Sequence, residues 1–248
     1  MRGWLPSRVD GIELLDNPKV DDVIRTRAQR EVERANAWFG GNRAVLVEMR
    51  RVLRRWPFSR ATLLDVGTGL GGIARMIRAQ GQRYGVSITT IGLDLREVLA
   101  RAARVSGSVA VRGDASRLPF ADRAADFVLC SQLLHHFRGA EALRVVRELG
   151  RVARRRVIVC DLRRSWLAAG GFWLASRGLG FHPITQHDGV ASVLRGFSSA
   201  ELLALIRAAG VPAPAVRRRL GFRLAVSWVP SPQVVRRAGK PRPRNPDA

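Results

Sequence analysis

Apolar runs and amphipathic stripes alternate along the middle of this 248-residue chain. Each short run rich in Val, Ile and Leu is typical of a buried strand, and the stripe after it has the spacing of a helix. Regular alternation of strand and helix predicts a parallel sheet that is covered by helices on both faces. The expected strands are 61–66, 87–93, 108–112, 125–130 and 156–161, and the expected helices between them are 70–80, 95–104 and 139–150.

Two amphipathic helices are expected before the first strand. The first ends at the glycine pair Gly40 and Gly41, and the second ends before Pro57. Residues 1–18 show no clear period and are expected to form an irregular lead-in. The pattern therefore predicts an N-terminal helical segment over residues 1–60.

The C-terminal part predicts one more helix and a hairpin. The segment 198–201 has the Ser-x-x-Glu spacing of a capping box at the start of that helix. Two segments, 216–220 and 222–229, are separated only by Gly221 and are expected to form an antiparallel pair of strands. Residues 230–248 are rich in proline and arginine and are expected to be disordered.

A glycine-rich turn joins the first expected strand to the first helix of the core. Its sequence is Ala61-Thr-Leu-Leu-Asp-Val-Gly-Thr-Gly-Leu-Gly-Gly72. Glycine is used where the backbone takes a positive φ or a ligand comes close, and the first N–H groups of the next helix point at that ligand. Such a turn suits either the pyrophosphate of a dinucleotide or the amino-acid end of S-adenosylmethionine. The carboxylate of Asp65 would repel a pyrophosphate and attract an ammonium group, so the local charge favours the cationic ligand.

The chain carries a formal charge of +23, and arginine supplies all but two of its 43 basic residues. Such a balance makes nucleic acid a candidate partner. Many of the arginines stand singly on polar helix faces, and no aromatic residues interleave with the arginine clusters as stacking platforms for bases would. A compositional preference for arginine is therefore favoured, and nucleic-acid binding is the alternative.

The cysteines and the apolar segments indicate the cellular compartment of the protein. Cys130 and Cys160 each lie in an expected strand, so buried, reduced thiols are expected. The opening residues lack the apolar region of a signal peptide. The longest apolar run, from Trp166 to Ala175, is too short to span a bilayer. We expect a cytoplasmic protein without a membrane span.

Four segments resemble, in the same order, the motifs of class I S-adenosylmethionine-dependent methyltransferases. They are Leu63 to Gly71, Ile91 to Asp94, Arg112 to Phe120 and Asp126 to Phe137. The resemblance implies a Rossmann-like α/β fold with a doubly wound, mostly parallel seven-stranded sheet, a C-terminal antiparallel hairpin and an N-terminal helical cap. The methyltransferase domain would then span residues 61–229.

The resemblance also implies where S-adenosylmethionine binds, because ligands of open parallel sheets lie beyond the carboxyl ends of the strands. In order, the four motifs would hold the methionyl part, the ribose hydroxyls, the adenine, and the methionyl chain with the transferred methyl group. The alternatives are an N-cap role for Asp94 and a turn-forming role for Asp114. The expected cofactor-binding residues are Asp65, Gly67, Thr68, Gly69, Gly71, Asp94, Leu95, Asp114, Ala115, Ser131 and Gln132.

All four histidines lie between the fourth expected strand and the capping box. Imidazole accepts a proton readily near neutral pH, and a phenol or enol must lose its proton as it attacks the methyl group. The candidate catalytic residues are His135, His136, His187 and Asp188, the last because an adjacent carboxylate can orient an imidazole. The alternatives are structural histidines that bond to the backbone. No metal site is expected, because the chain has no paired-cysteine spacing.

The segment 162–197 follows the fifth expected strand, where class I methyltransferases build a lid over the acceptor. It combines aromatic residues with glycines, which predicts a movable apolar lid. The alternative is a helix that packs in the core.

These features predict a methyltransferase that acts on an oxygen or carbon of a small lipophilic acceptor, of phenolic, quinone-like or polyketide type. The segment 112–137 is most similar to the branch that includes quinone-biosynthesis methyltransferases. The alternative is an RNA-directed methyltransferase that uses the basic surface, although the Asn/Asp-Pro-Pro-aromatic motif of amino-methylating enzymes is absent. A third interpretation is a binding protein that keeps the fold without the reaction.

Overall fold

A seven-stranded sheet forms the centre of the computed structural model, which describes residues 5–9, 13–17 and 19–230. The strand order is β3-β2-β1-β4-β5-β7-β6; the first five strands of the chain are parallel, and β7 is antiparallel to both neighbours. The predicted α/β sheet with a C-terminal antiparallel pair is therefore confirmed. The strands are β1 (Arg60–Val66), β2 (Ser87–Asp94), β3 (Val109–Arg112), β4 (Ala125–Ser131), β5 (Ala153–Leu162), β6 (Arg217–Arg219) and β7 (Arg223–Trp228).

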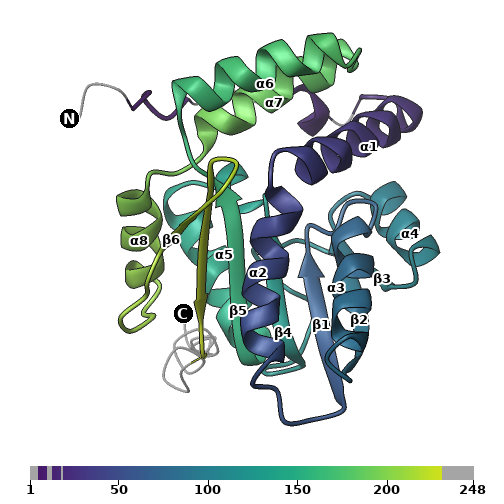
Figure 1. Cartoon of the computed structure of the whole chain (residues 1–248), viewed down its shortest axis with the longest axis vertical. Coiled ribbons are helices and arrows are strands. Elements are labelled where there is room, and N and C mark those ends of the chain that lie inside the picture. The colour runs from purple at the N-terminus through teal and green to yellow at the C-terminus, as the bar shows by residue number, and fades with distance from the viewer. Residues whose placement is uncertain (1–4, 10–12, 18, 231–248) are drawn as a thin grey trace, which may run out of the picture.

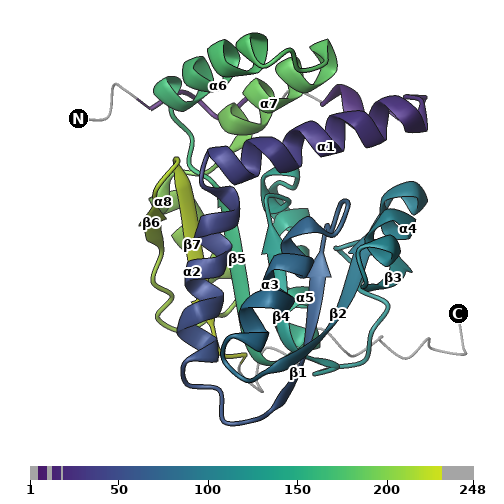
Figure 2. The same ribbon diagram turned by 45° about the vertical axis from the view of Figure 1, so that its right-hand side comes forward.

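Helices cover both faces of this sheet because successive side chains of each strand point to opposite faces. In β4, Phe127 and Leu129 pack with α2 and α3, whereas Val128 and Cys130 pack with α5 and α8. Figures 1 and 2 show these two helical layers on either side of the sheet. The helices are α1 (Asp22–Trp38), α2 (Gly41–Leu53), α3 (Gly72–Gln82), α4 (Glu97–Val105), α5 (Gly139–Val152), α6 (Trp166–Gly178), α7 (Pro183–Arg195) and α8 (Ser199–Ala208).

Three helices lie across the end to which the parallel strands point. These are α1, α6 and α7, and the short helix η1 (Leu14–Asp16) of the N-terminal lead-in packs against α7. The carboxylate of Asp21 accepts the N–H groups of Val23 and Ile24 and so caps the start of α1. None of the helices in the described part of the chain combines the length and apolar character that a membrane crossing requires.

The C-terminal half of the chain tests some of the sequence expectations. The segment 162–197 contains two helices, α6 and α7, and α6 buries only Ala169 and Ser176, so it does not pack in the core. The capping box between Ser198 and Glu201 is confirmed at the start of α8. The expected disorder of the tail concerns residues 231–248, which lie outside the described residues. The division into cap, methyltransferase domain and lid stays a prediction.

Candidate active site

A cavity of about 900 Å³ lies between the carboxyl ends of the strands and the cover made by α1, α6 and α7. The glycine turn and the ends of β2 and β3 form one wall. The opposite wall is largely apolar and includes Leu162, Leu167, Phe172 and Val193. Ligands of open parallel sheets bind at this end, and the volume is large enough for a cofactor with a small second ligand beside it.

The turn after β1 presents bare backbone to the cavity. Gly67 and Gly69 line it and have φ values of +76° and +54°. A Cβ atom at Gly67 would lie 2.9 Å from the Leu133 side chain, and one at Gly69 would collide with Gln29. Only glycine fits these two positions, so the backbone can approach a ligand closely.

Asp94 ends β2 at the cavity wall. Its Oδ2 accepts the N–H of Gly69 at 3.1 Å, and its Oδ1 accepts the N–H of Arg96 at 3.0 Å. Burial raises the pKa of Asp94 above its ordinary value. Because Arg96 is itself the N-cap residue of α4, Asp94 does not occupy the N-cap position that the sequence left as an alternative. Its carboxylate instead joins the glycine turn to the end of β2.

The third strand contributes the next part of the same wall. Asp114 and Ala115 line the cavity, as does Leu95 after β2. The Oδ1 atom of Asp114 accepts the N–H of Ser116 at 2.7 Å. Asp114 therefore forms a turn, as the alternative interpretation held, and also faces the cavity.

Several expected site residues lie behind the wall. Thr68 donates its hydroxyl to Asp65 Oδ2 at 2.9 Å, so both support the turn from below. Gln132 lines the cavity with a φ of +53°, whereas its neighbour at the end of β4 does not. Among the described residues, the expected ones that do not line the cavity are Asp65, Thr68, Gly71, Ser131 and His187.

Asp65 is buried, and burial changes the pKa of its carboxyl group. Burial raises its pKa to about 7, and the negative charge of Asp94 adds to the effect, while the Thr68 hydroxyl opposes it. A carboxyl with a raised pKa favours the protonated state in the folded protein. Its ionisation is therefore coupled both to folding and to the charge of any ligand at the turn.

We expect Asp65 to contribute a loss of stability to the cofactor-free protein as the pH rises from 3.8 to about 7, because in this range the folded state binds the Asp65 proton more tightly than the unfolded state. Asp65→Asn, which keeps an acceptor for Thr68, should remove this part of the slope. Urea unfolding across that pH range measures the effect. If the free energy of unfolding changed with pH in the same way in wild type and in the variant, the raised pKa of Asp65 would be contradicted.

His135 follows β4 and is buried beside β5. Its Nδ1 lies 2.7 Å from Asp161 Oδ1, and its backbone N–H is donated to Asp161 Oδ2. Burial by itself raises the pKa of a carboxyl, but the His135 ring, the Leu162 N–H and His136 together outweigh it, so the pKa of Asp161 lies below its ordinary value. With Nδ1–H donated to the carboxylate, Nε2 of a neutral ring is the proton acceptor. Within the described part of the chain, this Nε2 atom has no hydrogen-bond partner.

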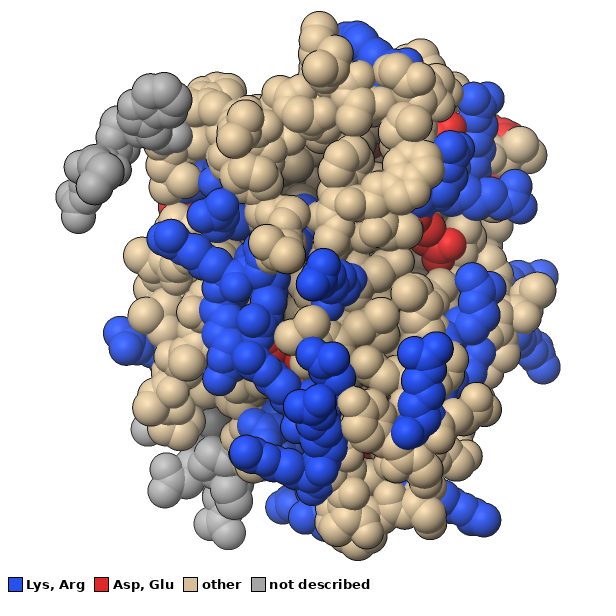
Figure 3. Space-filling view, viewed as in Figure 1, with Lys and Arg blue, Asp and Glu red and all other residues tan. Residues whose placement is uncertain are grey.

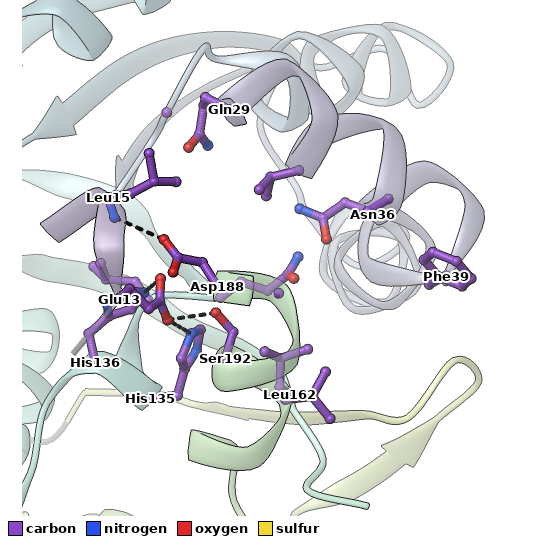
Figure 4. Close-up of a pocket in the computed structure, with 18 of the residues that line it drawn as sticks. Glu13, Leu15, Gln29, Asn36, Phe39, His135, His136, Leu162, Asp188 and Ser192 are labelled. Atoms are coloured by element: carbon purple, nitrogen blue, oxygen red, sulfur yellow. Dashed lines mark hydrogen bonds and ion pairs between the residues drawn. The ribbon is translucent and has the colours of Figure 1, made fainter. Parts of the chain in front are cut away.

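Glu13, from the lead-in, reaches the same place (Figure 4). Its Oε1 lies 3.8 Å from His135 Nε2, and its Oε2 lies 3.7 Å from His136 Nε2. The Ser192 hydroxyl donates to Glu13 Oε1 at 2.6 Å, and the Arg195 guanidinium lies 3.3 Å from the same oxygen. Glu13, His135 and His136 all line the cavity, and we call them the acidic–histidine cluster.

The acidic–histidine cluster is also the one group among the described residues whose ligand atoms, all within 4.8 Å of one another, could hold a metal ion. Carboxylate and imidazole are ordinary zinc ligands. Arg195 and Ser192 already occupy one oxygen of Glu13, so a divalent cation would stand beside a guanidinium charge. The expectation of no metal stays a prediction that chelation can test.

Asp188 lines the cavity, but its carboxylate binds the backbone of the N-terminal lead-in. Its two carboxylate oxygens accept the N–H groups of Leu14 and Leu15, at 2.8 and 2.9 Å. His187 Nδ1 lies 2.9 Å from Asp188 Oδ1, yet the His187 ring is more than half exposed and lies off the cavity wall. The structure therefore does not bring His187 to the cavity, and Asp188 orients η1 as well as the imidazole.

The sequence interpretation missed residues that come from outside the motifs. Glu13 lies in a lead-in without any periodic pattern, and Asp161 was noted only as the end of a strand. The tip of the β6–β7 hairpin also lines the cavity, through Leu220 and Phe222. A Cβ atom at Gly221 would collide with the Phe39 carbonyl, so a glycine lets this tip pack against the end of α1. Gly221 was the only sequence signal that pointed to this close contact of the hairpin tip.

Comparisons with known proteins bear on the fold and the domain. Residues 64–160 match the family model of a methyltransferase domain. A comparison with curated sequences finds no match. Among similar solved structures is a methyltransferase of Haloferax volcanii in complex with the activator Trm112, with 16% identity, a TM-score of 0.57, and coverage of 86% of this chain and 99% of that one. Another, from Thermotoga maritima, is an S-adenosylmethionine-dependent methyltransferase with a suggested histamine N-methyltransferase activity; it has 20% identity, a TM-score of 0.54, and coverage of 82% and 98%.

Residues 64–160 match a methyltransferase domain, and the sheet order and glycine turn are those of the class I S-adenosylmethionine-dependent methyltransferase fold. The chain carries the methyltransferase domain, and S-adenosylmethionine is its methyl donor. The residues present fit this donor, because Gly67 and Gly69 present bare backbone to the cavity beside the carboxylate of Asp94. The acceptor is a separate question.

Proposed function

We propose that this enzyme methylates an oxygen or carbon of a small lipophilic acceptor that carries an acidic hydroxyl, of phenolic, quinone-like or polyketide type. The observation that carries the proposal is the composition of the wall opposite the glycine turn. Leu162, Leu167 and Phe172 contribute apolar surface to it, and the acidic–histidine cluster lines the same cavity together with the polar residues Thr185, Asp188 and Ser192. An apolar wall with few convergent polar groups favours a greasy ligand that is oriented by one polar atom.

On the cofactor side, we propose that Asp94 accepts the ribose hydroxyls and that Asp114 with Ala115 borders the adenine. Leu95 would pack on the same ring system. Gly67 and Gly69 would approach the amino-acid end, and Gln132 would border the methionyl chain. S-adenosylmethionine supplies an electrophilic methyl group on a sulfonium sulfur. Residues behind the wall support this arrangement by shaping the turn and setting its charge: Asp65, Thr68, Gly71 and Ser131.

On the acceptor side, we propose that the acidic–histidine cluster takes the hydroxyl proton. Glu13 and His135 Nε2 are two acceptors that face each other at 3.8 Å, and a hydroxyl donor fits such a pair. His136 is more exposed than His135 and is the ring that meets the acceptor. As the acceptor forms its bond to the methyl carbon, the carbon–sulfur bond breaks and the proton moves to this cluster. Asp161 holds the His135 ring in the required tautomer.

The test is incubation of the protein with labelled S-adenosylmethionine and a panel of phenols, quinols and RNA. Transfer to hydroxylated lipophilic compounds is expected. Transfer to RNA alone would overturn the proposal, and tight cofactor binding without any transfer would favour a binding protein. Because both cysteines are buried free thiols, we place the reaction in the cytoplasm.

An RNA-directed reaction is the second candidate, because exposed arginines form a band over β6 and α2, seen in blue in Figure 3. Phosphate contacts of arginine would make RNA binding fall steeply with salt. A filter-binding titration is expected to show only weak RNA retention at physiological ionic strength. Tight retention under those conditions, with methylation of the RNA, would reverse the ranking.

A further inference from the structure

Helix α6 is apolar on nearly every side but mostly exposed. Its sequence, Trp-Leu-Ala-Ala-Gly-Gly-Phe-Trp-Leu-Ala-Ser-Arg-Gly, contains a single charged residue, Arg177 in the last turn. Trp166, Trp173 and Leu174 are exposed, Leu174 by 68%. A helix that is apolar all round normally lies in a protein core or in lipid. Among the described residues, α6 packs on α7, and the large side chains on its outer side are exposed.

The exposed apolar surface continues from α6 to the mouth of the cavity. Trp38 at the end of α1, Leu167 in α6 and Leu220 at the hairpin tip are all exposed, and all three also line the cavity. An apolar ligand could pass from the outer side of α6 into the cavity between these side chains. The surface of α6 is therefore continuous with the proposed acceptor site.

The charged side chains of the segment that carries α6 are all basic. From Leu162 to His187 the chain has no acidic residue. In Figure 3 the region of α6 is mostly tan, and a band of arginine lies below it over α2 and β6, where Arg43, Arg217 and Arg218 are exposed. An apolar face with exposed tryptophans, bordered by arginines, has the chemistry of a surface that meets an anionic bilayer.

We propose that the outer face of α6 docks on the surface of an anionic lipid bilayer and that the acceptor enters the cavity from that bilayer. The entry route rests on the proposed function, which makes the acceptor lipophilic. With 13 residues, α6 lies in the interface and does not span the bilayer. A second copy of the chain is a poorer occupant, because the same arginine band would border the face on both copies and repel.

Co-sedimentation with vesicles tests the docking without cofactor or acceptor. Wild type is expected to bind vesicles of phosphatidylcholine with phosphatidylglycerol, and to bind pure phosphatidylcholine vesicles much more weakly. The variant Trp166→Ser/Trp173→Ser/Leu174→Ser, whose substitutions lie off the cavity wall, should need at least about tenfold more lipid for half-maximal binding. The matched control Val105→Ser/Val109→Ser removes exposed apolar side chains from α4 and β3 and should bind like wild type.

Three results would overturn the docking proposal. Wild type could fail to bind either kind of vesicle, or the triple variant could bind as wild type does. Sedimentation velocity could also show a dimer that the triple variant loses, which would make this face an interface between copies. Activity on water-soluble phenols separates the two proposals. If transfer persists without vesicle binding, docking fails and the proposed function stands. If vesicles bind and no phenol is methylated, the proposed function fails together with the entry route, and docking stands.

Discussion

Asp94→Asn is expected to weaken the binding of S-adenosylmethionine by about a hundredfold. The reason is that a carboxylate at the end of β2 can accept both ribose hydroxyls while it keeps its bonds to Gly69 and Arg96. An amide offers one oxygen and turns a donor toward the second hydroxyl. Hydrogen bonds to charged groups contribute about 1.5–3 kcal/mol each, so the loss is large. Isothermal titration calorimetry measures the change in Kd.

The matched control for Asp94→Asn is Asp122→Asn. Asp122 is an exposed carboxylate that pairs with Arg151 at 2.8 Å and does not line the cavity. This control should bind the cofactor as wild type does. Thermal unfolding of both variants shows whether the turn still folds. An Asp94→Asn protein that binds S-adenosylmethionine with undiminished affinity would contradict the ribose assignment, and tight binding of a nicotinamide dinucleotide by wild type would contradict the whole reading of the turn.

The cofactor side could be predicted because its signals are local. The glycine turn, the strand before it and the helix after it lie within one short stretch. The positions of this turn that have a positive φ are glycines, which the sequence shows directly. The alternation in β4 that sends Phe127 and Val128 to opposite faces is equally local. The resemblance to methyltransferase motifs covers these same segments. The fold class and the cofactor class could therefore be predicted from the sequence.

The acceptor side could not be predicted because its contacts are long-range and polar. Glu13 meets Ser192 across 179 positions, and no periodic pattern marks either residue. The buried side of α7 includes Thr185, Asp188 and Arg195, so a search for apolar stripes does not detect this helix. Polar groups are buried there because they bond to the lead-in and to the histidine segment. These contacts become visible only once the chain is folded.

Glu13→Gln is expected to lower kcat for a hydroxylated acceptor by about 10²–10⁴-fold, the usual range for loss of a proton-accepting group. Glutamine keeps the size of the side chain and an oxygen for Ser192, but it removes the charge that attracts the proton. Binding of S-adenosylmethionine should be unchanged, because Glu13 belongs to the acceptor side of the cavity. Steady-state kinetics and calorimetry measure the two effects separately. The variant should recover activity at high pH, where the acceptor ionises without help.

Recovery at high pH separates proton transfer from structural loss. Glu97→Gln, which removes an exposed partner of Arg101, is the matched control and should keep full activity. Glu13→Asp keeps the charge and should retain more activity than Glu13→Gln. If a chelator abolishes wild-type activity and zinc restores it, the acidic–histidine cluster holds a metal and the proton-accepting role is wrong. A Glu13→Gln protein with normal kcat and an unchanged pH profile would also exclude a proton-accepting role for Glu13. In that case His136 would act without help from the Glu13 carboxylate, which lies 3.7 Å from its ring.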